Sequence, residues 1–320
     1  MLTWEERRQL VKIASLYYVE GLTQEQIAKR VGVSRPIISK YLQRAKEHGI
    51  VEVFIKDESL HTVELENKLE KLFDLKDVVV VPNAESIELT KKSVGQAAAN
   101  LIAKNLKKVK TIGISWGTTL AEVVKEFPYI RKDDVRVIPL VGGLGSQFVD
   151  IHANQLAYEL ARKLNGTCSY VYAPAFIEST ELRDHLTSLP DIKSVLDEMK
   201  KADMALVGIG NPYHENSTLK RLGYLTDDDI EEFKKVGAVG DLSSRFVDIN
   251  GDPITHSIND KVIGINLNEI RDIPLVIGVA VGDDKVNSVF GVLQGKYLDI
   301  LIIDEFTAQA VLEKKMKNIK

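Results

Sequence analysis

Short apolar runs alternate with helical stretches from about residue 78 onward, and this alternation most narrows the folds open to the chain. Strands that are apolar on both faces and separated by helices indicate a mainly parallel sheet covered on both sides, an α/β domain. The runs are Val78–Val81, Thr111–Ile114, Val135–Val141, Tyr170–Ala173, Met204–Ile209, Val262–Leu267, Leu275–Val281 and Leu298–Ile303. Helical patterns fill most gaps, for example Ser93–Leu106, Leu120–Phe127, Ala153–Leu164 and Val286–Leu293.

Turns rich in glycine and small residues follow four of these predicted strands, and ligands of such sheets bind at the carboxyl ends of the strands. The first turn carries Gly117, which lets the backbone approach a ligand, and then Thr118 and Thr119 at the start of a helix. The free N–H groups and the dipole of a helix N-terminus favour an anion there. The four turns are Ile114–Thr119, Leu140–Ser146, Gly208–Gly210 and Val281–Lys285.

Lys285 adds to this pattern because it stands in the first turn of a predicted helix, where the helix dipole disfavours a cation. A phosphate bound between the lysine and the helix N-terminus would neutralise both the cation and the positive end of the dipole. Each turn by itself is equally well explained as a tight connection that uses glycine for a positive φ. Four of them at one end of one sheet predict a phosphate site. These turns are not a dinucleotide fingerprint, because no G-x-G-x-x-G opens a helix after the first strand.

The first fifty residues have a different pattern, that of three short helices forming an all-α helix-turn-helix domain. Ala28 provides the small side chain needed where two helices cross, and Gly32 lies in the turn between them. A basic helical module for protein binding is the alternative, and it explains fewer of these features. The predicted helices are Glu5–Tyr18, Thr23–Val31 with a capping box from Thr23 to Gln26, and Ser34–Glu47. Ile50–Lys56 alternates and predicts a strand, which would form a short wing.

The outward face of the last helix carries donors and cations suited to base edges and phosphates. Arg35 and Ser39 are the candidates for base contacts, because they lie near the N-terminal end of the recognition helix. The candidate DNA-binding residues are Thr23, Gln24, Ser34, Arg35, Pro36, Ser39, Lys40 and Arg44.

Charge divides the chain at the same place. Residues 1–56 hold ten Lys and Arg against six Asp and Glu, a net charge of +4. The remainder must therefore carry −8 to give the total of −4, so a basic module is joined to an acidic body. We expect a DNA-binding domain at 1–56 and a sensing and oligomerisation domain at 57–320. The latter begins with a helix whose apolar face would pack on the body or on a second subunit.

Cys168 is the only cysteine, which excludes an intrachain disulfide and favours a buried small residue over a nucleophile. No apolar run approaches the length of a membrane span. The N-terminal residues Glu5 and Glu6 do not fit a signal peptide. We therefore expect a cytoplasmic protein without membrane association, metal or cofactor.

The full length of the chain resembles the SorC family of bacterial sugar-responsive regulators. The resemblance implies an effector domain related to sugar-phosphate isomerases and glucosamine-phosphate deaminases, and homodimers or homotetramers on operator DNA. In this order and combination the motifs are highly specific. They are the helix-turn-helix at 22–47, Gly113–Leu120, Pro139–Gly143, Val239–Phe246, Asn259-Asp260, Ile263–Ile265, Gly282–Val286 and Gly295–Asp304.

Matched residue by residue, Gly117, Thr118, Thr119 and Lys285 fall on the family's phosphate-binding positions, and the Gly142-Gly143 turn falls on a loop over the sugar. One branch, the deoxyribonucleoside regulators, carries a lysine before that glycine pair that can form a Schiff base. Val141 stands there in this chain, so we expect a non-covalent ligand. The candidate effector-binding residues are Ser115, Gly117, Thr118, Thr119, Gly142, Gly143, Gly208, Gly210, Asp241, Arg245, Asn259, Asp260 and Lys285.

These observations predict a transcriptional regulator, most simply a repressor of a carbohydrate-catabolism operon, that responds to a phosphorylated sugar or polyol. The alternative is a sugar-phosphate isomerase or deaminase with an attached DNA-binding module. Such chemistry needs a positioned carboxylate or histidine. Asp283 and Asp284 could form a carboxylate pair, although acids in the first turn of a helix are more simply explained by the dipole. His214 stands at a spacing unlike that of the deaminases. We expect no catalytic residues.

Overall fold

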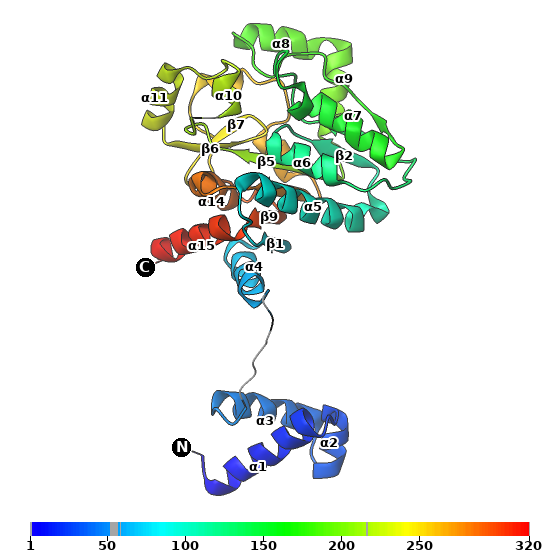
Figure 1. The fold of residues 1–320 in the computed structure, drawn as a ribbon, viewed down its shortest axis with the longest axis vertical. Helices are drawn as coiled ribbons and strands as arrows, with labels where there is room; N and C mark the ends of the chain where they lie inside the picture. The colour runs from blue at the N-terminus through cyan, green and yellow to red at the C-terminus, as the bar shows by residue number, and fades with distance from the viewer. Residues whose placement is uncertain (1, 52–56, 58, 216, 320) are drawn as a thin grey trace. The chain divides into compact units, whose positions relative to one another are not determined.

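A computed structural model describes residues 2–51, 57, 59–215 and 217–319 of the chain. The chain divides into two compact units, Met1–Leu60 and His61–Lys320, which we call the N-terminal and C-terminal units (Figure 1). The predicted boundary after residue 56 lies four residues before this division. Within the described residues, no helix is both long enough and apolar enough to cross a bilayer.

Three helices form the core of the N-terminal unit around Ile27 and Ile38, both fully buried. A capping box between Thr23 and Gln26 begins the second helix, as predicted, and Gly32 ends it with a φ of 76°. The elements are α1 (Trp4–Ala14), the π-helix η1 (Ser15–Val19), α2 (Gln24–Val31) and α3 (Arg35–Glu47). Most of the predicted wing strand Ile50–Lys56 falls outside the described residues.

A mainly parallel sheet organises the C-terminal unit, as predicted. Its order is β1-β9-β8-β5-β2-β3-β4, and every pair along this path is parallel. The strands are β1 (Asp77–Val81), β2 (Thr111–Ile114), β3 (Arg136–Pro139), β4 (Thr167–Cys168), β5 (Met204–Gly210), β8 (Val276–Ala280) and β9 (Ile300–Asp304). An antiparallel hairpin, β6 (Ala238–Leu242) and β7 (Arg245–Asp248), extends from the end of β5.

Two predicted strands, Tyr170–Ala173 and Val262–Leu267, are wrong. In the first, the Asn154 side chain bonds both the N–H and the carbonyl of Val171, which removes groups that a ladder would need. In the second, Gly264 makes only an isolated bridge to Val141, and the segment leads into a helix at Leu267. Both segments are apolar because they are buried, although they are not strands.

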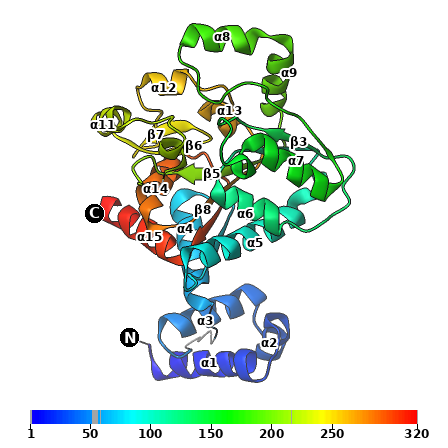
Figure 2. The same ribbon diagram turned by 45° about the horizontal axis from the view of Figure 1, so that its top comes forward.

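Helices cover both faces of the sheet because successive side chains of each strand point to opposite sides. In β5, Met204 and Leu206 face one core, whereas Ala205 and Val207 face the other. Figure 2 shows β8 between α5 and α6 on one side and α14 and α15 on the other. The first core is covered by α5 (Ile87–Asn105), α6 (Thr118–Glu126) and α7 (Ala153–Leu164). The second is covered by α4 (Leu60–Phe73), α9 (Pro190–Met199), α13 (Leu267–Arg271), α14 (Val286–Gln294) and α15 (Glu305–Ile319).

A third, smaller core lies between the β6–β7 hairpin and nearby short helices, with Phe233 and Phe246 at its centre. The hairpin turn consists of Ser243 and Ser244, which have φ values of 51° and 66°. Such a two-residue turn normally selects asparagine and glycine, so two serines here carry backbone strain. The remaining helices are α8 (Thr180–Ser188), α10 (Thr218–Arg221), α11 (Asp227–Lys235), α12 (Ser257–Asp260), η2 (Leu106–Lys108), η3 (Val149–Ile151) and η4 (Asp283–Lys285).

Helix α4 forms hydrogen bonds to the edge strand β1 and also packs into the hydrophobic core. The N–H groups of Val78 and Val80 on the outer side of β1 donate to Glu70 Oε1 at 3.2 Å and to Glu66 Oε1 at 2.9 Å. Burial raises the pKa of the Glu66 carboxyl. The predicted apolar face of this helix, with Leu65 and Leu69 buried, thus packs on the body of the same chain.

Candidate functional site

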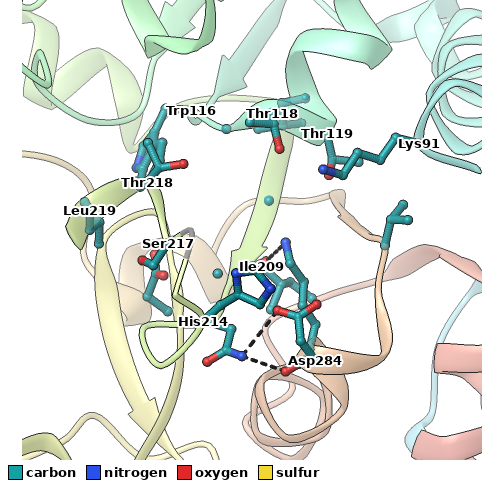
Figure 3. A pocket seen from close by; sticks show the side chains of 18 of the residues that line it. Lys91, Trp116, Thr118, Thr119, Ile209, His214, Ser217, Thr218, Leu219 and Asp284 are labelled. Carbon is teal, nitrogen blue, oxygen red and sulfur yellow. Dashed lines mark hydrogen bonds between the residues drawn. The ribbon is translucent and has the colours of Figure 1, made fainter. Parts of the chain in front are cut away.

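A cavity of about 380 Å³ opens at the carboxyl ends of β2, β5 and β8 (Figure 3). We call it the strand-end pocket. Three of the four predicted glycine-rich turns meet in it, because their strands are parallel and close together in the sheet. Its lining residues are Ile87, Glu88, Lys91, Ser115–Leu120, Gly208–Asn211, His214, Ser217–Leu219, Arg221, Asp241, Ser243, Val281, Asp284 and Lys285.

The N-terminus of α6 faces the strand-end pocket. Gly117 precedes the helix with a φ of 136°, a conformation that L side chains rarely adopt, and a Cβ there would meet no other atom. Its N–H donates to the Ile151 carbonyl at 3.0 Å. No side chain caps this helix, so the positive end of its dipole is directed at the pocket without a partner in the described chain.

Buried hydroxyl groups without hydrogen-bond partners concentrate in the same place. Within the described residues, four buried side-chain polar atoms lack a partner, and three of them, Ser115 Oγ, Thr119 Oγ1 and Ser243 Oγ, belong to residues of the strand-end pocket. These three residues are 1%, 4% and 2% exposed. A buried unpaired hydroxyl costs about 1–3 kcal/mol. Three such hydroxyls in one pocket indicate that a polar ligand completes their hydrogen bonds.

Lys285 and Asp241 place opposite charges in the pocket. The Lys285 ammonium group donates to the Ile209 carbonyl at 2.8 Å, which keeps it at the end of β5. Burial lowers the pKa of Lys285. Burial also raises the pKa of Asp241 to about 6, although the Ser244 N–H and Lys285 both oppose that shift. Lys285 is the last residue of η4 and the N-cap residue of α14, so it directly precedes the first turn of that helix.

Asp241 depends on Gly210, its partner in the β5–β6 pair. A Cβ on Gly210 would overlap with Asp241 Oδ1, so only glycine leaves room for this carboxylate. Asp241 Oδ2 accepts the Ser244 N–H at 3.1 Å, and Ser244 Oγ accepts Nε1 of Trp116 at 2.9 Å. The strained serine turn therefore connects the carboxylate to the aromatic wall of the pocket.

Eight of the thirteen predicted effector-binding residues lie outside the β3 turn and the 245–260 segment, and all eight line the strand-end pocket. These are Ser115, Gly117, Thr118, Thr119, Gly208, Gly210, Asp241 and Lys285, with the predicted Gly208–Gly210 turn contributing Ile209 as well.

The other predicted residues serve other contacts. Gly142 packs against the backbone of Ala173 and Pro174, and Gly143 pairs with Pro174, so neither lines the strand-end pocket. The Gly142-Gly143 turn belongs to β3, which is farther along the sheet from β8 than β2 and β5 are. We therefore remove both glycines from the proposed site.

Arg245, Asn259 and Asp260 are also outside the pocket lining. The Arg245 guanidinium donates to the carbonyls of Val262, Gly264, Ile265 and Asn259, and burial lowers its pKa to about 10. The Asn259 side chain bonds both backbone groups of Phe246. Asp260 is exposed. The first two hold the segment after the hairpin in place, which explains their motif without a ligand.

Several lining residues were not predicted from the sequence. Lys91, Arg221 and Ser243 come from helices and a hairpin turn that carry no glycine signal, and they reach the pocket only through the packing of the C-terminal unit. Asn211 directly follows the Gly208–Gly210 turn and could have been included by extending that turn. Its side chain donates to the Asp284 carbonyl at 2.7 Å, which joins the β5 and β8 turns.

The candidate DNA-binding residues lie at the start and on the outside of α2 and α3. Arg35, Ser39 and Lys40 are exposed, as are Ser34 and Pro36. Thr23 is engaged in its capping box, and Gln24 is half-buried. Arg44 lies 3.6 Å from Glu6 in an ion pair within the unit, which competes with a phosphate contact.

Comparison with known proteins gives consistent results along the chain. The model of the sugar-binding domain family (Sugar-bind) matches residues 57–313. The sorbitol operon regulator of Klebsiella pneumoniae is 30% identical over 312 residues, which cover 97% of this chain and 99% of that protein. The deoxyribonucleoside regulator of Bacillus subtilis (strain 168) is 31% identical over 310 residues, covering 96% and 98%.

Solved structures agree with these relatives. The full-length sorbitol operon regulator SorC of Klebsiella pneumoniae aligns with a TM-score of 0.77 and 31% identity over 96% of this chain and 99% of that chain. A DeoR family transcriptional regulator from Listeria monocytogenes aligns with a TM-score of 0.74 and 38% identity, covering 78% of this chain and 99% of that chain.

Proposed function

This chain belongs to the SorC family of transcriptional regulators with a sugar-binding domain, and from that premise we propose that it is a repressor of a carbohydrate-catabolism operon. Its operator affinity would change when the C-terminal unit binds a phosphorylated sugar or polyol without a covalent bond. The protein would act as a homodimer or homotetramer on operator DNA. The relatives are named as regulators, and no observation favours the alternative of a sugar-phosphate isomerase or deaminase.

The observation that carries the sensing half is the uncapped N-terminus of α6 beside three buried hydroxyls without partners. A phosphate group offers several acceptor oxygens and about −1.5 to −2 charges at pH 7, so it can satisfy the hydroxyls and the helix dipole together. Ser115, Thr119 and Ser243 would donate to it or to the sugar, and Lys285 would supply a cation.

A thermal-shift screen against sugar and polyol phosphates tests this proposal, with each unphosphorylated sugar as its own control. One phosphorylated ligand should raise the melting temperature of the protein and its parent sugar should not. Lys285→Ala should remove that shift while operator binding persists. Equal shifts from phosphorylated and unphosphorylated ligands would contradict the phosphate assignment.

A second measurement tests whether the ligand is held non-covalently. Val141, at the position of a Schiff-base lysine in one branch of the family, is fully buried in the hairpin core. The strand-end pocket has two lysines of its own, Lys91 and Lys285, and the pKa of Lys285 is lowered by burial. Reduction with borohydride in the presence of the effector should leave the protein mass unchanged. An adduct on Lys285 would overturn the non-covalent assignment.

The DNA-binding half rests on α2 and α3, which are joined by a tight turn at Gly32, with Arg35 and Lys40 exposed on α3. We propose that α3 is the recognition helix of a helix-turn-helix. Arg35→Ala or Lys40→Ala should abolish operator binding and leave the effector-induced thermal shift intact. Lys12→Ala, which removes an exposed cation from α1, is the control for net charge. Equal operator affinity for all three variants would refute the assignment of α3.

A further inference from the structure

Lys91 is a cation of the strand-end pocket that no motif of the sequence singles out. It lies in α5, five residues after the N-cap Ser86, and its side chain is half-buried. Figure 3 shows it reaching toward Thr119. Within the described chain, its ammonium group has no hydrogen bond and no carboxylate within 4.0 Å. A half-buried lysine keeps its alkyl stem against the protein while its ammonium group remains accessible, here to a ligand in the pocket.

Lys91, from α5, and Lys285, from the end of η4, both line the strand-end pocket. Burial is the main cause of the lowered pKa of Lys285, and the charge of Lys91 lowers it further. Lys285 also stands at the N-cap of α14, where the dipole disfavours a cation. The pocket also contains the carboxylates of Glu88, Asp241 and Asp284. The charges of Asp241 and Asp284 stabilise the protonated form of Lys285, because they raise its pKa against the effect of burial.

We infer that Lys91 is a second cation of the phosphate site and that Lys91 and Lys285 together select a doubly charged phosphate ester over singly charged anions. This inference rests on the proposed function. The buried Ser115 and Thr119 hydroxyls show that the site is built for a polar ligand whatever its charge. A second ammonium group adds a requirement for a second negative charge, which a phosphate monoester has and a sulfate ester or carboxylate lacks.

Methyl phosphate and methyl sulfate isolate this charge difference, because both present the same tetrahedral group on the same methyl ester. We would work in a Trp4→Phe background, where Trp116 is the single tryptophan and its emission reports unfolding of the C-terminal unit. The dependence of the melting temperature on ligand concentration gives the dissociation constant of each ester. The wild-type pocket should bind methyl phosphate about 10- to 100-fold more tightly, the range of one charged hydrogen bond.

Lys91→Gln should weaken methyl phosphate binding by the same factor of about 10 to 100 and change methyl sulfate binding much less. The variant should therefore lose the preference for methyl phosphate over methyl sulfate. Lys91→Arg should restore most of the preference. Lys92→Gln is the matched control, since Lys92 is the next residue on α5 and is exposed outside the pocket. A purely structural role for Lys91 would weaken both esters equally, and that result would overturn the inference.

The same panel separates failure of this inference from failure of the proposed function. If Lys285→Ala removes methyl phosphate binding and Lys91→Gln behaves like Lys92→Gln, the phosphate site stands and the role of Lys91 is refuted. If the parent protein binds neither ester, both the phosphate site and the role of Lys91 are refuted.

Discussion

Asp241→Asn should stabilise the C-terminal unit at neutral pH and have a much smaller effect in acid. Asp241 is 5% exposed, and burial raises its pKa from 3.8 to about 6. Below about pH 3 the carboxyl is protonated in both the folded and the unfolded chain. As the pH rises from about 4 to 6, the unfolded chain ionises first, and the free energy of unfolding falls. Asparagine keeps the shape and an acceptor for the Ser244 N–H but carries no charge.

The size of the effect follows from the two pKa values. A difference of roughly two units at about 1.4 kcal/mol per unit gives about 3 kcal/mol of lost stability above the folded-state pKa. About 2 kcal/mol of this falls in a window between about pH 4.5 and pH 7, where unfolding can be measured. The variant should therefore gain about 2 kcal/mol relative to its parent across that window.

Urea unfolding followed by Trp116 emission in the Trp4→Phe background measures this difference, because the only remaining tryptophan lies in the C-terminal unit. Glu88→Gln, which removes an exposed charge from the same pocket, controls for the change in net charge. A difference between Asp241→Asn and its parent that stays constant with pH would refute the reasoning, since it would mean that Asp241 titrates alike in both states.

Three further experiments test close packing in the C-terminal unit and a helix cap in the N-terminal unit. Gly142→Ala places a Cβ 2.5 Å from a backbone carbonyl and should cost about 1–3 kcal/mol in urea unfolding, whereas Gly143→Ala has its nearest contact at 3.9 Å and should cost much less. Gly210→Ala should displace the Asp241 carboxylate at a similar cost, and the double variant with Asp241→Ala should cost less than the sum of the singles; strict additivity would contradict the contact. Thr23→Ala should lower the stability of the N-terminal unit by about 1 kcal/mol in thermal melts followed by circular dichroism, and an unchanged melt would contradict the cap.

The parallel sheet could be predicted because buried strands leave a local signature. Met204–Gly210 and the first four residues of Ile300–Asp304 are continuous apolar runs of strand length between helical patterns. The same signature misled at Tyr170–Ala173, because burial alone makes a segment apolar and the sequence does not show that Asn154 occupies its backbone. The hairpin at 238–248 was missed because Ser243 and Ser244 carry none of the glycine or asparagine that normally identifies such a turn.

Part of the candidate site could be predicted because helix N-termini and glycine turns are local features. Gly117, Thr118 and Thr119 follow one strand directly, and parallel topology alone brings them near Lys285. Lys91 depends on where α5 packs, which no local pattern specifies. Arg245 shows the converse: its motif was recognised, but its four carbonyl contacts are visible only in the folded chain.

The two glutamates of α4 that accept the outer N–H groups of β1 also block the pairing of this strand with a second copy of the chain. An uncovered edge strand is a template for pairing with another chain, and β1 is a run of four valines with high β-propensity. Glu66 and Glu70 occupy its donors at Val78 and Val80. A truncated C-terminal unit beginning after α4 would expose that row and should aggregate through it, so the helix that begins the C-terminal unit also prevents edge-to-edge pairing of its sheet.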